Sequence, residues 1–396
     1  MDEISQRSFE LACTAHDKGL LQEARRQYLL LIELHPDHAS LRYNLGLIYF
    51  QQDEFDHAIN EFSLAASFEP EDTDTLFNLA LCQKKTGDYA AAIATHIRLL
   101  IIEPNHFDSL FCLGNCYRDQ YDDDQAIGCY QRALTLNPAY VPAIHNIADI
   151  HYRAGDHDLV IMYYKQILEK QPQNESIRYL LAALQGVHLD HAPDAYIHDV
   201  FNSYASEFEQ DLVVELGYDN PQQLYDCLNR SDARGAYCLH GLDLGCGTGL
   251  SGIVFKKMVH VLDGVDLSED MIAHAIDKKC YAQIYQDSIV HHMTTTEETY
   301  DLFLATDVFV YIGDLVPILS LAGTIATPGA LFCCSTEHLN GTQYRLQPTG
   351  RFAYSPEYIE QTALKTGWRI VSQESAPLRL EDDEWLTGDL WILKRN

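Results

Sequence analysis

The sequence predicts a chain of two parts, an α-helical solenoid followed by an α/β domain with a doubly wound, mostly parallel sheet. Three observations carry this prediction. Prolines recur every 34 residues in the first half, apolar strand-like segments alternate with helical ones from about residue 190, and a glycine-rich turn, GLDLGCGTGLSG, follows the first of those strands. At 396 residues the chain is too long for one ordinary core, which also favours two domains.

Acidic side chains dominate both parts of the chain. The formal net charge is −31; up to residue 185 there are 14 basic against 27 acidic residues, and beyond it 13 against 31. Such a surface repels phosphate backbones, and the largest basic clusters are pairs such as Lys256-Lys257. We therefore expect no nucleic-acid partner.

The cysteines and the N-terminal segment bear on the compartment. The eleven cysteines are scattered and form no C-x-x-C pair. We therefore expect no zinc ribbon, no other metal site and no redox motif. The first residues lack the basic and apolar regions of a signal peptide, and no stretch of about 20 apolar residues follows that would cross a membrane. These features predict a cytoplasmic protein that does not act at a membrane.

The first half repeats with a period of 34 residues. A small residue stands twelve positions before each of the five prolines, and in each unit a ring stands eight positions before the proline. Small residues allow two antiparallel helices to approach, rings fill the groove between them, and proline ends the second helix. The prolines are Pro36, Pro70, Pro104, Pro138 and Pro172; the small residues are Ala24, Ala58, Ala92, Ala126 and Val160; the rings are Tyr28, Phe62, His96, Tyr130 and Tyr164.

This pattern closely resembles the tetratricopeptide repeat family, over residues 5 to about 174 as five units. Residues 175–184 have helical spacing and are expected to cap the array, so the first domain is placed at 1–188. The resemblance implies a groove that binds a protein or peptide. Asn44, Asn78 and Asn146 share one position on the helix expected to line it, and an asparagine amide can pair with a peptide backbone. Local backbone contacts are the alternative role for these amides.

The second domain, placed at 189–396, alternates strands and helices. Residues 197–212 have helical spacing, and the first strand, at about 237–245, leads into the glycine loop and a helix to about Met258. Further strands are expected at 260–267, 282–287, 300–311, 330–339, 368–377 and 390–396, with helices at 268–279 and 355–367. This order predicts a parallel, doubly wound sheet, whose ligands bind at the carboxyl ends of the strands.

The glycine loop fits two kinds of cofactor. Gly247, Gly249 and Gly252 match the G-x-G-x-x-G spacing of a dinucleotide site, while Gly245, Gly247 and Gly249 match G-x-G-x-G after an aspartate. Asp266 suits ribose hydroxyls in either case. Asp243 favours S-adenosylmethionine, because a carboxylate would repel a pyrophosphate but attract a sulfonium or an ammonium group. Gly252 is then expected to serve helix packing.

The segments LDLGCGTGL, GVDLSEDM and ATDVFVYIGDL closely resemble class I S-adenosylmethionine-dependent methyltransferases, which have a Rossmann-like fold. Residues 194–396 resemble, more narrowly, predicted bacterial methyltransferases that carry tetratricopeptide repeats in front. The resemblance implies that the glycines approach the methionyl part, that Leu267 and Met271 pack on adenine, and that Tyr204 closes over the cofactor. The implied cofactor-binding set is Asp243, Gly245, Gly247, Gly249, Asp266, Leu267, Met271, Asp287, Ser288, Thr306 and Tyr204.

The acceptor side is predicted from residues near strand ends. Asp307, Tyr311 and His338 are the candidate catalytic residues, with Glu337 and Arg351 as further substrate-side groups. Methyl transfer needs a base only when the acceptor must lose a proton. The signature D/N-P-P-Y/F of base and amide methylation is absent from this segment, TDVFVY.

The sequence thus predicts a methyltransferase whose repeats recruit a protein or peptide, with that partner as a candidate methyl acceptor. The first alternative is an enzyme for a small metabolite, with the repeats used for assembly. A second alternative, from a different class, is a scaffold whose second domain binds the cofactor without catalysis, and the intact cofactor signature speaks against it.

Overall fold

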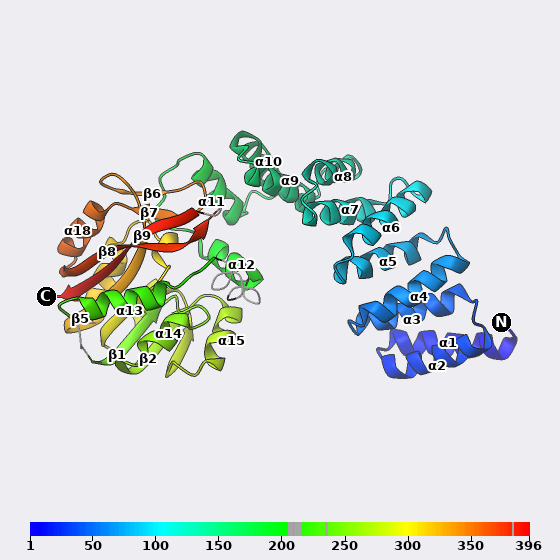
Figure 1. The fold of residues 1–396 in the computed structure, drawn as a ribbon, viewed down its shortest axis with the longest axis horizontal. Coiled ribbons are helices and arrows are strands. Elements are labelled where there is room, and N and C mark those ends of the chain that lie inside the picture. Colours follow the sequence, from blue (N-terminus) through cyan, green and yellow to red (C-terminus); the bar gives the residue numbers. More distant parts are fainter. Residues whose placement is uncertain (205–208, 210–215, 234–236, 382–383) are drawn as a thin grey trace. The chain divides into compact units, whose positions relative to one another are not determined.

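The computed structural model describes residues 1–204, 209, 216–233, 237–381 and 384–396. The chain divides into two compact units, Met1–Pro172 and Gln173–Asn396 (Figure 1). Both units are treated separately below.

The first unit consists of ten helices arranged as five antiparallel pairs, one for each 34-residue period. The helices are α1 (Glu3–Asp17), α2 (Leu21–Leu34), α3 (Ala39–Gln51), α4 (Phe55–Phe68), α5 (Thr73–Lys85), α6 (Tyr89–Ile102), α7 (Phe107–Asp119), α8 (Asp123–Leu136), α9 (Val141–Arg153) and α10 (His157–Lys170). Every second helix ends two residues before one of the recurring prolines. The expected helical solenoid is confirmed.

The turn inside each pair has a left-handed residue at the same place in the period. Gly19, Gly87 and Gly155 have φ between +74° and +79°, while Asp53 and Tyr121 take up φ of +57° and +60°. Glycine adopts this conformation without steric cost, and the other two residues adopt it because the pairing of the helices requires the same turn.

Small and ring residues that recur at a fixed spacing form the core of each repeat. The five small residues before the prolines are fully buried, and the five rings are at most 4% exposed. Two glycines allow especially close approach: a Cβ at Gly46 would lie 2.7 Å from the Phe62 ring, and one at Gly114 would lie 2.6 Å from the Tyr130 ring.

The second unit is built on a nine-stranded mixed sheet. The parallel strands β3 (Gln283–Gln286), β2 (Val259–Asp266), β1 (Cys238–Leu244), β4 (Tyr300–Ala305) and β5 (Ala326–His338) lie side by side in this order. On the far side of β5, β9 (Glu384–Arg395) and β8 (Trp368–Glu381) form an antiparallel hairpin, and β7 (Phe352–Tyr354) and β6 (Tyr344–Leu346) extend the carboxyl end of β5. The parallel part is as expected.

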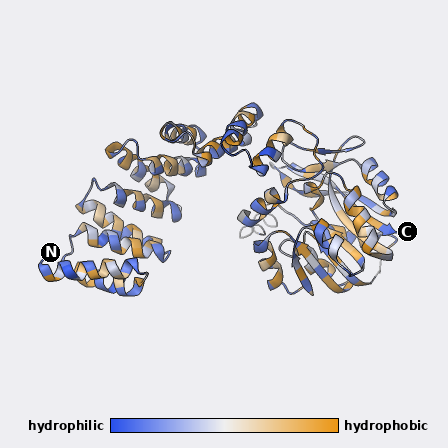
Figure 2. Ribbon diagram, turned by 180° about the vertical axis from the view of Figure 1, so that it is seen from behind, coloured by the Kyte–Doolittle hydropathy of each residue, from blue (hydrophilic) through white to orange (hydrophobic). Residues whose placement is uncertain are grey.

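Apolar side chains cover both faces of this sheet, which is the pattern of a doubly wound fold. Phe303 and Phe332 belong to one core, and their neighbours Leu304 and Leu331 belong to the other. The first core includes residues of α17 (Val316–Ile325) and α18 (Pro356–Lys365); the second includes residues of α13 (Asn220–Arg230) and α14 (Leu250–Phe255). Figure 2 shows the hydrophobic residues of this unit gathered on the strands and the helix faces toward them.

Helix α11 (Glu175–Leu184) lies within the second unit, although the sequence assigned it to the repeats as a cap. Tyr179 is 2% exposed within the first core of that unit, and its hydroxyl donates a hydrogen bond to the Gly350 carbonyl at 2.9 Å. The boundary between the compact units therefore follows residue 172, sixteen residues before the expected one, because the apolar face of α11 packs on the α/β core.

The remaining helices are α12 (Asp194–Tyr204), α15 (Glu269–Asp277) and α16 (Ile289–Thr295), with a short 3-10 helix, η2 (Phe309–Tyr311). The expected helix at 197–212 begins earlier, and most of its second half lies outside the described residues. The expected fourth strand ends at Ala305, where the chain turns into η2.

Candidate functional site

The glycine loop joins β1 to α14 at the carboxyl edge of the sheet. Gly245, Gly247 and Gly249 have φ of +68°, +51° and +92°, a region that favours glycine. A Cβ at Gly247 would meet no atom within 4 Å, so the backbone there borders open space. Gly252 instead packs under the loop, where a Cβ would lie 2.5 Å from the Tyr281 ring, in keeping with its expected packing role.

Asp266 ends β2 and holds this loop. Its carboxylate accepts hydrogen bonds from the Gly247 N–H at 2.8 Å and from the Ser268 N–H at 2.9 Å. Burial raises the pKa of Asp266, and these backbone bonds oppose that shift by stabilising the charged form. A carboxylate has further lone pairs, so the side chain can accept more hydrogen bonds from a ligand.

Asp243, near the end of β1, is almost fully buried. It is 1% exposed, and the Tyr281 hydroxyl donates to its carboxylate at 2.6 Å. Burial raises the pKa of Asp243 to about 7, so its charge is incomplete near neutral pH. In the described part of the chain Asp243 is not among the residues that line the cavity, so its interaction with the cofactor, expected either directly or through water, stays a prediction.

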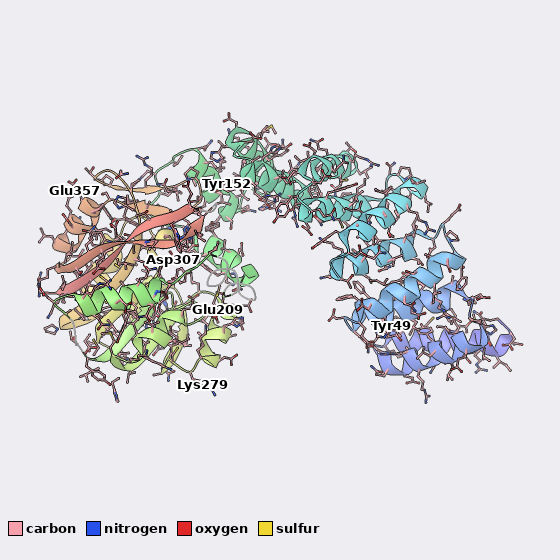
Figure 3. The ribbon with its side chains drawn as sticks, viewed as in Figure 1. Tyr49, Tyr152, Glu209, Lys279, Asp307 and Glu357 are labelled. Atoms are coloured by element: carbon pink, nitrogen blue, oxygen red, sulfur yellow. The ribbon has the colours of Figure 1, made fainter. Side chains whose placement is uncertain are left out.

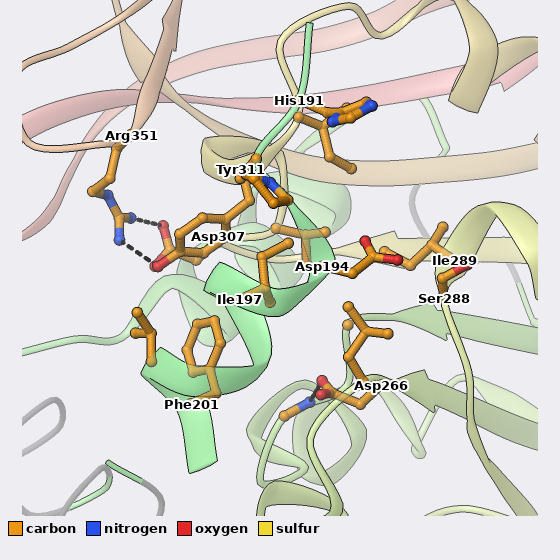
Figure 4. A pocket seen from close by; sticks show the side chains of 18 of the residues that line it. His191, Asp194, Ile197, Phe201, Asp266, Ser288, Ile289, Asp307, Tyr311 and Arg351 are labelled. Atoms are coloured by element: carbon orange, nitrogen blue, oxygen red, sulfur yellow. Dashed lines mark hydrogen bonds and ion pairs between the residues drawn. The ribbon is translucent and has the colours of Figure 1, made fainter. Parts of the chain in front are cut away.

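A cavity of about 1330 Å³ opens beside the loop, and every described residue of its lining belongs to the second unit. Figure 4 shows Asp266 toward one end, Arg351, Asp307 and Tyr311 toward the other, and Ile197 and Phe201 of α12 between them. It lies beside the ends of β1 and β4, adjacent strands whose connections run to opposite sides, which is where open α/β sheets bind ligands.

Most of the predicted cofactor residues line this cavity. They are Gly245, Gly247, Asp266, Leu267, Met271, Asp287, Ser288 and Thr306. Gly249 is the N-cap residue of α14 and, with Asp243, is absent from the described lining. The side chain of Tyr204, the remaining residue of the predicted set, lies outside the described residues.

At the other end, two arginines and two carboxylates form a buried cluster. Arg351 donates from Nη2 to Asp307 at 2.9 Å and from Nε to Glu337 at 2.5 Å. Arg379 donates from Nη2 to the same Glu337 oxygen at 3.0 Å. We call Asp307, Glu337, Arg351 and Arg379 the arginine corner.

Asp307 has unusual geometry for a residue at a strand end. Its φ is +61°, a strained conformation for a residue with a side chain, and such strain is concentrated at functional sites. Its N–H donates to the Ser335 hydroxyl at 2.8 Å, which fixes the backbone. Figure 3 shows Asp307 in the interior of the second unit.

Tyr311 accepts a hydrogen bond from Arg351 Nη1 at 3.3 Å. Burial raises the pKa of Tyr311, so this phenol stays protonated and serves as a hydrogen-bond donor, not as a base. Asp307, Tyr311 and Arg351 line the cavity as expected of acceptor-side residues, whereas Glu337 is 4% exposed and sits behind the arginines.

His338 is a correction to the predicted catalytic set. It does not appear in the described cavity lining, and its Nδ1 lies 2.7 Å from the carboxylate of Asp389, which is fully buried. Successive side chains of a strand point to opposite faces, so Glu337 and its neighbour His338 cannot share one. The sequence reasoning missed Arg379, Tyr218 and Tyr179, which line the cavity from distant elements and carry no local motif.

The segment that follows α11 forms one wall of the cavity. Leu189 to Ala195 line it, and the Ala192 N–H donates to the Tyr311 carbonyl at 2.8 Å. The Asp190 carbonyl accepts from the Gly313 N–H at 2.7 Å, and His191 forms an isolated antiparallel bridge with Ile312. These bonds attach the wall to the loop that carries Tyr311.

The three asparagines of the repeats all have hydrogen-bond partners within the repeats. The Asn44 and Asn78 amides donate to the carbonyls of Ser40 and Asp74, one helical turn earlier. Asn146 donates to Asn115 at 3.0 Å and accepts from Arg118 at 3.2 Å. The backbone contacts of Asn44 and Asn78 match the local role weighed above, whereas Asn146 contacts side chains of the neighbouring repeat. The Asn78 amide also donates to the Tyr43 hydroxyl at 3.4 Å.

The described residues include no group of three or more His, Cys, Asp or Glu side chains arranged to hold a metal ion. None of the described helices is long and apolar enough to cross a membrane.

A glycine loop at the switch point, an acid ending the second strand and helical repeats before the sheet define a class: a repeat protein with a methyltransferase-type α/β domain. Comparison with known families agrees. Residues 242–329 match the methyltransferase domain family, and residues 9–68, 75–106 and 107–140 match tetratricopeptide repeat families. The chain carries tetratricopeptide repeats and a methyltransferase domain.

Similar proteins include two curated relatives, both named ubiquinone biosynthesis O-methyltransferase. The one from Bradyrhizobium sp. (strain ORS 278) is 32% identical over 127 residues, 30% of this chain and 49% of that protein. The one from Nitrobacter winogradskyi is 32% identical over 123 residues, 29% and 46% of the two chains. This chain spans about half the length of these relatives. A solved tetratricopeptide repeat protein from Parabacteroides merdae ATCC 43184 is 21% identical with a TM-score of 0.44, covering 52% of this chain and 80% of that one.

Proposed function

We propose that the second unit transfers a methyl group from S-adenosylmethionine to a small acceptor bound in the same cavity, and that the repeats bind a partner protein. The observation that carries the proposal is the placement of Asp266 and the glycine loop at one end of the cavity, with the arginine corner at the other. The match to the methyltransferase domain family supports this use of the loop.

The residues at the loop fit this cofactor. Any side chain at Gly247 would project into open space beside the cavity, so glycine leaves room for the methionyl part. Asp266, already oriented by two backbone N–H groups, would accept hydrogen bonds from the ribose hydroxyls. Met271 and Leu267 would contact the adenine, and Asp287 would face its amine. When bound, the cofactor supplies a methyl group activated by a sulfonium.

The cavity is large enough for a donor and an acceptor together. Its volume of about 1330 Å³ exceeds the roughly 300–1,000 Å³ typical of sites for one small ligand. The chain's residues position the acceptor and exclude water, which are the main contributions to an in-line displacement. Asp307, which accepts a hydrogen bond from Arg351, is the group placed to accept a proton from an acceptor that carries one.

A small acceptor is favoured over a protein acceptor by the position of Asp307 in the cavity and by the two relatives, both named ubiquinone biosynthesis O-methyltransferase. The repeats would then recruit or position a partner instead of presenting the methylated group. A protein acceptor held by the repeats remains the competing possibility, as does a domain that binds the cofactor without turnover.

Calorimetry on the full-length protein tests the cofactor. We expect S-adenosylmethionine to bind and NAD not to bind, and binding of NAD alone would overturn the proposal. Transfer of labelled methyl in native lysate, with separation of protein from small molecules, then tests the acceptor. Label in the small-molecule fraction is expected; label only in protein would select the competing acceptor, and no S-adenosylhomocysteine at all would mean that the domain is not an enzyme.

A further inference from the structure

The arginine corner contains more hydrogen-bond donors than its own carboxylates use. Arg379 is 7% exposed and lines the cavity, yet its Nη1 has no hydrogen-bond partner among the described residues. The nearest carboxylate oxygen of an ion pair with this nitrogen is that of Asp307, at 3.9 Å, which is beyond hydrogen-bonding distance. A buried guanidinium nitrogen without a partner costs free energy, so a missing acceptor is indicated at this point.

Neighbouring side chains add donors and few acceptors. Tyr311 already accepts from Arg351, so its own O–H is left to donate toward the cavity. Tyr218 is 7% exposed and lines the same space, and burial raises the pKa of both phenols, which keeps them protonated. An acceptor that brought further N–H groups, such as an amine, would leave these donors unsatisfied.

The charges of the arginine corner also favour an anionic acceptor. Arg351 and Arg379 are balanced by Asp307 and Glu337, and Glu381 is a more exposed carboxylate at 3.8 Å from Arg379. If S-adenosylmethionine binds as proposed above, its sulfonium adds one positive charge beside the four residues of the arginine corner, whose own formal charges cancel when the more exposed Glu381 is left out. A single anionic group on the acceptor would restore the balance in a site where charges interact strongly.

Other carboxylates of the lining lie apart from the arginine corner or already have partners. The Asp190 and Asp314 carboxylates accept from the hydroxyls of Tyr344 and Tyr358 at 2.8 and 2.9 Å. Asp266 lies at the loop end in Figure 4. The walls between the two ends are largely apolar and include Ile197, Phe201, Ile312 and Ile318.

We propose that the methyl acceptor carries a carboxylate, which binds in the arginine corner to Arg379 and Arg351 while the rest of the molecule contacts the apolar walls. This inference rests on the proposed function for the identity of the reaction. Arginine is suited to this task because its planar fork of N–H groups matches the two oxygens of a carboxylate. The carboxylate belongs either to a free organic acid or to the C-terminus of a peptide, which present the same chemistry.

Binding to the full-length protein tests this proposal. Calorimetry with saturating S-adenosylhomocysteine would use acetate, benzoate, phenylacetate, 3-phenylpropionate and octanoate, each beside its primary amide and the corresponding amine. The peptide source is probed with acetyl-Gly-Phe as free acid and as amide. We expect at least one acid to bind about 10-fold or more tightly than its amide, the effect of hydrogen bonds to a charged group.

Variants assign the preference to the arginine corner. Arg379→Gln should remove the preference for the acid, and Arg379→Lys, which keeps the charge and loses the fork, should weaken it. Arg369→Gln, at an exposed position on the same strand, should leave it unchanged. Thermal unfolding of each variant shows whether the fold is retained, and the lysine variant is the test if the glutamine variant does not fold.

The outcomes separate the two proposals. Amides binding as well as acids, amines binding best, or an acid preference that survives Arg379→Gln would each overturn the carboxylate site. Failure of S-adenosylmethionine to bind in a separate titration would overturn the proposed function instead. Tighter binding of the peptide acid than of every small acid would identify a peptide as the source of the carboxylate.

Discussion

The two units bury polar side chains for opposite purposes. In the repeats, the buried His96 has its partner nearby in the array: it is 1% exposed and its Nδ1 lies 2.8 Å from the Ser109 hydroxyl, which is fully buried, whereas the buried Nδ1 of His38 has no partner among the described residues. In the α/β unit, buried polar groups converge on a cavity from β2, β4, β7, β8 and the loops beside them, and Arg379 Nη1 has no partner among the described residues. The satisfied His96 serves packing, whereas the unsatisfied Arg379 and the strained Asp307, which line one cavity together, indicate a site for a ligand.

The unfolding of the two units can be followed by different spectroscopic signals. All three tryptophans, Trp368, Trp385 and Trp391, lie in the second unit, so their fluorescence reports its unfolding alone. Circular dichroism at 222 nm reports largely the ten helices of the repeats. A change confined to one signal shows which unit depends on the altered residue.

The largest expected effect is on donor binding. Asp266→Ala should weaken S-adenosylmethionine binding by about 1000-fold or more, because hydrogen bonds to a charged group contribute about 1.5–3 kcal/mol each and the loop loses its anchor at Gly247. Calorimetry measures this, with Asp270→Ala, exposed on α15, as the control. Retained affinity in Asp266→Ala would show that the glycine loop is not the donor site.

The second effect is a pH dependence of the α/β unit. The folded unit holds a proton on Asp243 up to a pKa of about 7, while the unfolded chain releases it near the ordinary value of 3.8. The free energy of unfolding should therefore fall as pH rises from about 4 to 7, by roughly 4 kcal/mol for a shift of this size.

Asp243→Asn should flatten that part of the curve, as measured by denaturant unfolding followed by tryptophan fluorescence. Asp270→Asn serves as the control. Curves of equal slope for the wild type and Asp243→Asn would mean that Asp243 is ionised throughout.

The repeats should respond to pH with the opposite sign. Burial lowers the pKa of His96 to about 4 from 6.5, so the neutral form stabilises the fold above about 6.5 and that stability is lost as pH falls toward 4. The loss should reach roughly 3 kcal/mol. His96→Phe, which places there the residue found at Phe62 in another repeat, should abolish this dependence in the circular dichroism signal.

A matched variant separates this effect from that of surface histidines. His57 has a side chain that is 67% exposed, and His57→Gln should keep the acid sensitivity of the wild type. If His96→Phe and wild type lose stability equally on acidification, the source lies elsewhere in the array.

The smallest effect concerns packing within one repeat. Gly114→Ala places a Cβ 2.6 Å from the Tyr130 ring and should destabilise the repeats by about 1–2 kcal/mol, a typical cost of overpacking. Gly128→Ala, on α8, meets no atom within 4 Å and should instead stabilise by about 0.5–1 kcal/mol. Equal thermal unfolding of the two variants would show that the helices separate freely at Gly114, and the tryptophan signal should not change in either.

The repeat array was predictable because its information is local. A proline, a small residue and a ring recur at one period, and each repeat forms its core from its own residues and those of its neighbours. The parallel strands β1, β2, β4 and β5 were predictable for a similar reason, since each contains a short apolar run of buried residues. The helices α13, α16 and α17 and the β6–β7 pair were not predicted, because short amphipathic segments leave a weak pattern.

The site was only partly predictable, because long-range packing decides which side chains meet. Asp266 and the glycines carry a motif, and the structure brings them together. Arg379 reaches the cavity through the register of a long antiparallel hairpin, and Tyr179 through the packing of α11, neither of which a local pattern encodes. His338 was misplaced by assigning neighbouring strand residues to one face.

Binding of the proposed methyl donor should change the protonation of Asp243. Burial is the main cause of the raised pKa of Asp243, and the like charge of Asp266 adds to it, so a cation bound beside Asp266 should lower that pKa and release the proton. Heat of S-adenosylmethionine binding near neutral pH would then vary with the ionisation enthalpy of the buffer. After methyl transfer the sulfonium becomes a neutral thioether, and Asp243 takes up its proton again. The product S-adenosylhomocysteine then lacks the attraction between a positive sulfur and a charged carboxylate that the methyl donor has. The proposed enzyme would thus distinguish substrate from product by proton exchange at a buried residue outside the described cavity lining.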